Sequence, residues 1–120
     1  SLLKAYRIQE RAAKFGFDWP AGDATPVLAK VDEELSEIRE ALSEKSAPRL
    51  AEEIGDLLFA TVNLSRHSGV NPEEALQQAS RKFAERFRLV EHSVAETGKP
   101  WKEFSLDELD DFWEKAKQSC

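Results

Sequence analysis

Cysteine is nearly absent from this sequence, which has only Cys120 at its C-terminal end. A single cysteine excludes an intramolecular disulfide and a zinc site built from several cysteines. The sequence also lacks an apolar run long enough to cross a membrane, and it shows no signal-peptide pattern. We therefore expect no membrane partner, and we expect the protein to work in the cytoplasm.

The motifs of nucleophilic catalysis are missing as well. No glycine-rich phosphate loop and no serine-based motif occurs, and neither His67 nor His92 shows a nucleophile partner. Covalent catalysis by a side chain is therefore not expected. A water activated by a metal ion is the attacking group that remains.

Basic residues are outnumbered by acidic ones, with 17 Lys and Arg against 23 Asp and Glu and a net charge of −6. This balance disfavours binding to a nucleic-acid polymer, although a metal ion could bridge a small anion to the acids. The composition is 41% hydrophobic and 33% charged, which is typical of a globular protein. We expect one domain over residues 1–120, and the abrupt start at Ser1 suggests a domain excised from a longer, two-domain protein.

Hydrophobic spacing and capping residues predict helices throughout the chain, and no stretch alternates at period two for long enough to form a strand. Thr25 followed by Pro26 is a helix-start signal, and Gly16 is a helix-stop signal. The expected fold is all-α, an antiparallel bundle of four to five helices. The predicted helices cover residues 2–15, 25–44, 46–67, 71–96 and 105–117.

Two acidic segments on successive predicted helices each carry two carboxylates three residues apart. Residues three apart share one face of a helix, so the two members of each pair can converge on one point. Four carboxylates that meet at one place require a cation. These acids are Glu34, Glu37, Glu53 and Asp56.

The position of each acid on its helix separates it from the other charged residues. At about 100° per residue, Glu34 and Glu37 lie beside the apolar stripe of helix 25–44, whereas Glu33 points to the opposite side. Asp56 stands directly before the run 57–62, which is apolar on nearly all sides and is expected to be buried. An ordinary solvated helix face explains one such pair, but two pairs on successive helices favour a cation site.

The residue types restrict the identity of the cation. Carboxylate oxygens suit Mg²⁺ or Mn²⁺, and Mg²⁺ usually shares its coordination shell with substrate phosphates. A carboxylate-bridged di-iron centre would need Glu-x-x-His on two helices. Leu64 precedes His67 and Leu89 precedes His92 at that spacing, so the di-iron alternative is excluded.

Three basic residues could hold phosphate oxygens opposite such a metal. Lys82 and Arg86 are four residues apart on helix 71–96 and share a face, and Lys30 precedes the first acidic pair. The alternative is that Lys82 and Arg86 pair with surface acids.

The aromatic residues allow two interpretations each. The loop 17–22 carries two aromatics, which either anchor it to the core or line a pocket. We expect Phe83 and Phe87 to lie in the core rather than to stack on a base. Trp101 and Trp113 could cover a nucleobase, but packing is the favoured interpretation.

The Glu-Glu-x-x-Glu and Glu-x-x-Asp motifs occur in this order, and several other stretches of the chain match the same known family. These stretches are residues 8–20, 30–37, 52–67, 71–75, 81–83 and 86–87. Together they resemble MazG-type nucleoside triphosphate pyrophosphohydrolases of the all-α NTP pyrophosphatase superfamily. The likeness covers nearly the whole chain and is greatest to the catalytic C-terminal domain of two-domain MazG proteins.

The resemblance implies hydrolysis of a nucleoside triphosphate to the monophosphate and pyrophosphate by a homodimer of helical bundles, with Mg²⁺ or its substitute Mn²⁺. It implies that Glu34, Glu37, Glu53 and Asp56 are the catalytic metal ligands. The substrate-binding residues that it implies are Lys30, Glu33, Lys82, Arg86 and Trp113. A non-catalytic helical interaction module with a solvated acidic face remains the alternative from another functional class.

Overall fold

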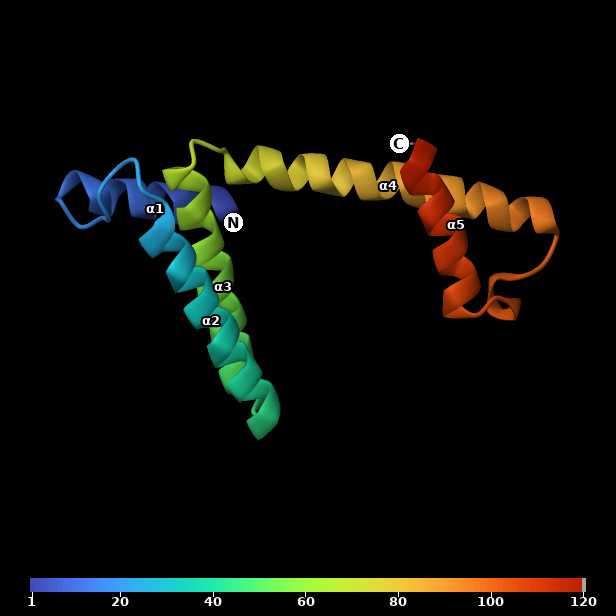
Figure 1. Ribbon diagram of the computed structural model, residues 1–120, viewed down its shortest axis with the longest axis horizontal. Helices are drawn as coiled ribbons and strands as arrows, with labels where there is room; N and C mark the ends of the chain where they lie inside the picture. Colours follow the sequence, from blue (N-terminus) through green and yellow to red (C-terminus); the bar gives the residue numbers. More distant parts are fainter. Residues whose placement is uncertain (120) are drawn as a thin grey trace. The chain divides into compact units, whose positions relative to one another are not determined.

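A computed structural model of the chain describes residues 1–119, so that Cys120 lies outside the described residues. The described part contains five α-helices, one short 3-10 helix and no strand, which confirms the all-α prediction (Figure 1). None of these helices is both long and apolar enough to span a bilayer. The elements are α1 (Leu2–Lys14), α2 (Thr25–Glu44), α3 (Ala47–His67), α4 (Pro72–Thr97), η1 (Trp101–Glu103) and α5 (Leu106–Ser119).

The chain divides into two compact units. Residues Ser1–Ala75 form the first unit, with α1, α2, α3 and the start of α4, and the second unit extends from Leu76 onward. Each unit has its own packed interior and is described by itself below. The single domain over residues 1–120 stays a prediction.

A two-residue turn joins α2 to α3 and makes the two helices an antiparallel hairpin (Figure 1). Lys45 ends α2 in the left-handed conformation with φ 55°, and its N–H donates to the Leu42 carbonyl at 3.2 Å. The Ser46 hydroxyl then caps α3 by accepting from the Arg49 N–H at 3.4 Å. The short turn matters for function because it sets the acidic faces of both helices side by side.

The interior of the first unit lies mainly between α2 and α3, where Val27, Ala41, Ala60 and Val62 are buried. The prediction that the apolar run of α3 is buried on nearly all sides is wrong in the described chain. Leu58 is 54% exposed and Phe59 is 45% exposed. The reason is that α1 and α2 leave one side of α3 without a covering helix.

The second unit is built on α4 and α5. Val90 and Val94 of α4 pack with Ala116 of α5, and partly buried aromatic side chains surround this cluster. The predicted cap of the last helix is confirmed, because Ser105 Oγ accepts from the Glu108 N–H at 3.1 Å and Glu108 Oε1 accepts from the Ser105 N–H at 3.0 Å.

The prediction that Phe83 and Phe87 belong to the core is wrong in the described chain. Phe83 is 58% exposed and Phe87 is 39% exposed, and their rings stack with centroids 6.1 Å apart. The two residues are four positions apart and share a side of α4 that α5 covers only in part. On this side, the ring centroids of Trp113 and Phe83 are 5.0 Å apart.

Candidate metal centre and pocket

The hairpin of α2 and α3 brings three of the four predicted acids together. One carboxylate oxygen from each of Glu34, Glu53 and Asp56 can be chosen so that all three lie within 4.8 Å of one another. Glu34 is only 6% exposed, whereas Asp56 is exposed. The cluster therefore extends from the interior to the surface, with its outer side open to a ligand.

The charges of this cluster are poorly balanced by the chain itself. The pKa of Glu53 is raised, first by burial and then by the negative charges of Glu37, Glu34 and Asp56. The Lys30 ammonium lies 3.2 Å from Glu34 Oε1 and 3.4 Å from Glu33 Oε1, and its own pKa is raised mainly by the bond to Glu34. One ammonium group among several carboxylates leaves excess negative charge. Hard oxygen donors with this excess fit a divalent cation such as Mg²⁺.

Glu37, the fourth predicted ligand, is held by a different partner. Its Oε2 accepts from Arg49 Nη2 at 2.8 Å, and the same guanidinium binds Glu40 at 3.0 Å and Glu44 at 2.7 Å. These hydrogen bonds raise the pKa of Arg49, with the bond to Glu44 as the largest cause. Glu37 is thus close enough to raise the pKa of Glu53 but is bound to an arginine. Its role as a metal ligand stays a prediction.

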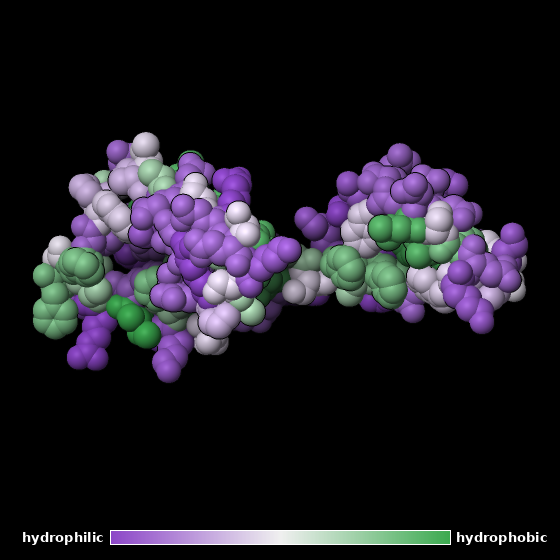
Figure 2. All heavy atoms as spheres, turned by 90° about the horizontal axis from the view of Figure 1, so that it is seen from below, coloured by the Kyte–Doolittle hydropathy of each residue, from purple (hydrophilic) through white to green (hydrophobic). Residues whose placement is uncertain are grey.

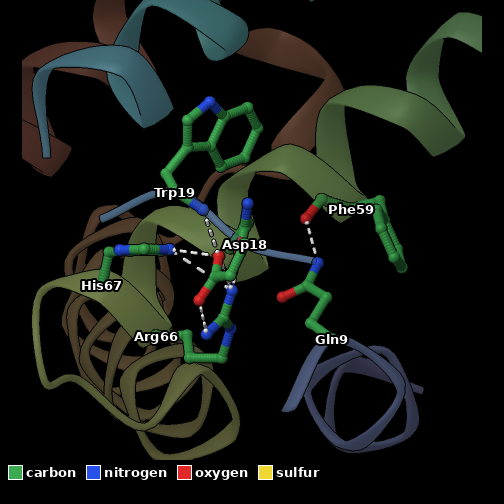
Figure 3. A network of polar contacts seen from close by, with 7 residues as sticks. Gln9, Asp18, Trp19, Phe59, Arg66 and His67 are labelled. Carbon is green, nitrogen blue, oxygen red and sulfur yellow. Dashed lines mark hydrogen bonds and ion pairs between the residues drawn. The ribbon is translucent and has the colours of Figure 1, made fainter. Parts of the chain in front are cut away.

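A charged network fastens the loop after α1 to the end of α3 (Figure 3). Asp18 accepts hydrogen bonds from both terminal nitrogens of Arg66, each at 2.8 Å, and lies 2.8 Å from His67 Nε2. The Arg66 hydrogen bonds, followed by those from His67 and the Trp19 N–H, hold the pKa of Asp18 well below its usual range. The Trp19 ring packs edge-on against His67, with centroids 6.4 Å apart. The loop that carries this tryptophan is therefore fixed in place.

A pocket of about 740 Å³ lies beside the acids, between α1, the fixed loop, α2 and α3. Two of the three clustered carboxylates, Glu34 and Asp56, form part of its wall. The two aromatics of the loop also line it, which is one of the two roles that the sequence left open, while Trp19 in addition packs against His67. The side chains that give the rest of the wall its apolar character are Ile8, Ala12, Phe17, Trp19, Phe59 and Ala60.

Gln9 is a residue of this pocket that sequence reasoning missed. It is 6% exposed and is the buried residue of α1, and its Nε2 donates to the Phe59 carbonyl at 2.9 Å. A signal for it existed, because Gln9 lies three residues from Tyr6 and from Ala12 and so shares the apolar side of its helix. A polar residue in the middle of an apolar helix face indicates either a core hydrogen bond or a ligand.

The remaining predicted substrate-binding residues belong to the second unit. Lys82 is exposed on α4, and Arg86 on the same helix is partly buried. Trp113 packs against the cluster of Val90, Val94 and Ala116, which confirms the packing interpretation. Contact of Lys82, Arg86 and Trp113 with a nucleotide stays a prediction, as does contact of Glu33.

The fold and the acidic cluster define this chain as an all-α protein. Carboxylates from two antiparallel helices form a candidate site for a hard divalent cation beside its pocket. Comparison with known families identifies it further. The model of the MazG nucleotide pyrophosphohydrolase domain matches residues 24–91, which include all four predicted acids. The chain belongs to this family, as the sequence motifs predicted.

Individual relatives agree with the family assignment. The nucleoside triphosphate pyrophosphohydrolase/pyrophosphatase MazG of Thermotoga maritima is 48% identical over 117 residues, which cover 98% of this chain and 44% of the relative. The nucleoside triphosphate pyrophosphohydrolase of Escherichia coli is 43% identical over 122 residues, covering 98% of this chain and 45% of the relative. The uncharacterized protein YabN of Bacillus subtilis is 40% identical over 70 residues, 58% of this chain and 14% of its own length. The chain thus spans less than half the length of these relatives.

Proposed function

We propose that this chain hydrolyses nucleoside triphosphates to nucleoside monophosphates and pyrophosphate with the help of Mg²⁺, for which Mn²⁺ can substitute. The observation that carries the proposal is the convergence of Glu34, Glu53 and Asp56 within 4.8 Å beside the pocket. The printed names of the relatives from Thermotoga maritima and Escherichia coli support it, since both are called nucleoside triphosphate pyrophosphohydrolases.

The clustered acids would hold the metal ion, which would act on the phosphates and on the attacking water. Glu34, Glu53 and Asp56 supply hard oxygen ligands, and Glu37 joins them if Arg49 releases it. A bound Mg²⁺ would polarise phosphoryl oxygens and make a nearby water a better nucleophile. Carboxylates and a triphosphate repel each other, so the acids cannot bind this substrate without a cation between them.

The proposed reaction joins a water oxygen to the α-phosphorus and breaks the bond from that phosphorus to the oxygen bridging the α- and β-phosphates. The bridging oxygen leaves with pyrophosphate, and the attacking water loses one proton, which passes to the solvent. Lys30, which lies 3.2 Å from Glu34, would hold a phosphate oxygen next to the acids. Lys82 and Arg86 are proposed to bind phosphate oxygens as well.

The chain would act as a homodimer. Figure 2 shows apolar side chains at the surface of both units, and α3 exposes Ile54 and Leu58, four residues apart on one face, each by 44% or more. Large apolar groups exposed together on one helix usually meet a partner. A second copy of the chain is the proposed partner, and the cytoplasm is the proposed compartment.

Measuring the products from a mixed pool of nucleoside triphosphates, with Mg²⁺ and with EDTA, tests this function. Pyrophosphate and monophosphate should appear in equal amounts and only with the metal. Glu53→Gln should lower turnover by more than about a hundredfold, because even residues that only support metal ligands contribute roughly 10–100-fold. The matched control is Glu52→Gln, which changes the exposed neighbouring acid and should keep wild-type turnover.

The outcomes separate the two functional classes. Release of single phosphate groups would refute the proposed bond cleavage. No turnover by the wild type with any nucleotide and metal would instead support the non-catalytic interaction module, in which the acids form a solvated face.

A further inference from the structure

A row of basic side chains runs along one face of α1. Residues three and four apart share a face of a helix, and the basic residues of α1 follow this spacing. At about 100° per residue they fall within about 80° of one another, and Glu10, the acidic residue of this helix, lies outside the row. All of them are exposed. The members of this basic row are Lys4, Arg7, Arg11 and Lys14.

The basic row has no acidic partner in the described chain. Within residues 1–119, none of its four side chains forms an ion pair or a hydrogen bond. Other basic residues of the first unit are paired, since Arg49 binds three glutamates and Arg66 binds Asp18. The net charge of the protein is −6, yet the described chain places no carboxylate against this row. The row is therefore free to bind an anionic group from outside the chain.

Large apolar side chains stand beside the basic row. Phe15, four positions after Arg11 at the end of α1, is 83% exposed. Ile8 lies between Lys4 and Arg11 on the helix surface and is 52% exposed. Arginine and aromatic residues are enriched where proteins bind one another. A phosphate backbone is held by cations and would gain little from an exposed phenylalanine, so this neighbourhood favours a protein over a nucleic acid.

A lipid surface fits this face of α1 poorly. A helix binds a bilayer surface by burying its apolar face among the headgroups. The apolar face of α1 is already packed on the first unit, because Gln9 is buried there and donates to the Phe59 carbonyl of α3 at 2.9 Å. Tyr6 and Ala13 lie half-buried on the same side. Only the opposite, basic face of the helix is left for a partner.

We propose that the basic row of α1, with Phe15 as its apolar contact, binds an acidic helix of a partner protein. A helix whose carboxylates recur three and four positions apart presents them with the same spacing, about 15 Å from first to last over ten positions. Each arginine can hold a carboxylate through two parallel hydrogen bonds. The inference does not depend on the proposed function, since the basic row and Phe15 lie outside the pocket wall and the acidic cluster.

A synthetic peptide of this pattern is the probe that tests the assignment. It is an alanine-rich, fluorescein-labelled helix with four glutamates spaced by three, four and three positions and with leucines beside them. A scrambled peptide has the same composition, but its glutamates are spread around the helix. Fluorescence anisotropy should show roughly tenfold tighter binding of the patterned peptide by the wild type, the scale of a few exposed ion pairs. Added salt should weaken this binding.

Reversing the charges in the middle of the row tests the same contact from the side of the protein. Arg7→Glu combined with Arg11→Glu should weaken binding of the patterned peptide by roughly tenfold or more, because two attractions become repulsions. A peptide with lysines in place of its two middle glutamates should bind this double variant more tightly than it binds the wild type. Arg39→Glu combined with Arg88→Glu changes the net charge equally at exposed positions of α2 and α4 and should bind as the wild type does.

The remaining measurements separate a protein partner from other anions. Phe15→Ala should weaken binding of the patterned peptide by about threefold or more, through loss of apolar contact. A wild type that binds the patterned peptide no better than the scrambled one overturns the proposal, as does an unchanged affinity of the variant with Arg7→Glu and Arg11→Glu. The comparison of the two peptides decides the matter even if this variant does not fold. Tighter binding of a single-stranded oligonucleotide, or of phosphatidylserine-containing vesicles, at the same salt concentration would also overturn it.

Discussion

At the scale of single residues, the carboxylate cluster is held together against its own repulsion. Glu34, Glu53 and Asp56 approach within 4.8 Å, while the ammonium of Lys30 lies on Glu34 at 3.2 Å. Like charges at such distances raise the free energy of the protein without a cation. Neutralising one acid should therefore leave the metal-free protein as stable or more stable if the acid is a metal ligand. It should destabilise the protein if the acid is a structural ion-pair partner.

Asp56→Asn distinguishes these two roles. As a metal ligand, Asp56 is repelled by its neighbours in the metal-free protein, so the variant should be as stable as the wild type in EDTA or more stable. The wild type should gain about 2.7 kcal/mol at a hundredfold excess of Mg²⁺ over its dissociation constant, and the variant much less. Melting curves in EDTA and in Mg²⁺ measure both effects, with Asp32→Asn as an exposed control. A variant that is clearly less stable in EDTA, with an undiminished Mg²⁺ response, would remove Asp56 from the site.

Asp18 predicts a pH dependence of stability. Its pKa in the folded chain is lowered, mainly by the Arg66 hydrogen bonds. The stabilisation from the ionised form is therefore complete above the ordinary aspartate pKa of about 4 and is lost as the pH falls below it. The difference in melting temperature between the wild type and Asp18→Asn should be largest near neutral pH and should shrink with acidification. A difference that stays constant from neutral to acid pH would contradict this assignment.

At the scale of helices, the α2–α3 hairpin supplies both the acids of the proposed metal site and an arginine that binds one of them. Arg49, in the first turn of α3, binds three glutamates from the second half of α2, including Glu37 at 2.8 Å. A cation that recruits Glu37 must break this ion pair. In the proposed site, Arg49 would therefore compete with the metal for Glu37, while its ion pairs strengthen the contact between the helices.

Arg49→Ala should consequently bind Mg²⁺ more tightly than the wild type. The expected gain is roughly two- to fivefold, the scale of one exposed ion pair. Isothermal titration with Mg²⁺ measures the affinity, and circular dichroism checks that the hairpin remains folded. Arg39→Ala removes the same charge from an exposed position of α2 outside these ion pairs and controls for net charge. An equal gain in both variants would show a general charge effect rather than the release of Glu37.

At the scale of the whole molecule, the exposed apolar side chains require an explanation. The prediction of a buried α3 fails within one chain, and the proposed homodimer would cover its exposed apolar residues. Leu58 is 54% exposed on this face. A charge placed there should be tolerated by the isolated chain and rejected by an interface between two copies.

Sedimentation velocity tests the homodimer. The wild type should sediment at twice the chain mass of 13.6 kDa at micromolar concentration, and Leu58→Lys should shift it toward the monomer because the lysine would be buried without a partner. Leu106→Lys, at a position 82% exposed in the second unit, is the matched control. A wild type that stays monomeric at this concentration would refute the dimer.

The sequence by itself determined the features that depend on neighbouring residues. Helix limits followed from hydrophobic period and from caps such as Ser105 with Glu108, because these signals act within one or two turns. The pairing of Glu34 with Glu37 and of Glu53 with Asp56 followed from helical spacing alone. The family resemblance was visible in the same short motifs, and the match to residues 24–91 confirms it.

Only the tertiary structure decided which partners those residues meet. Helical spacing places Glu37 beside Glu34, but the turn of the hairpin places it against Arg49, twelve positions along the chain. Gln9 became a pocket residue because α1 packs on α3, fifty positions away at Phe59. The burial of α3 and of Phe83 was mispredicted for the same reason. Periodicity shows which side of a helix is apolar, but the packing of distant segments determines what covers that side.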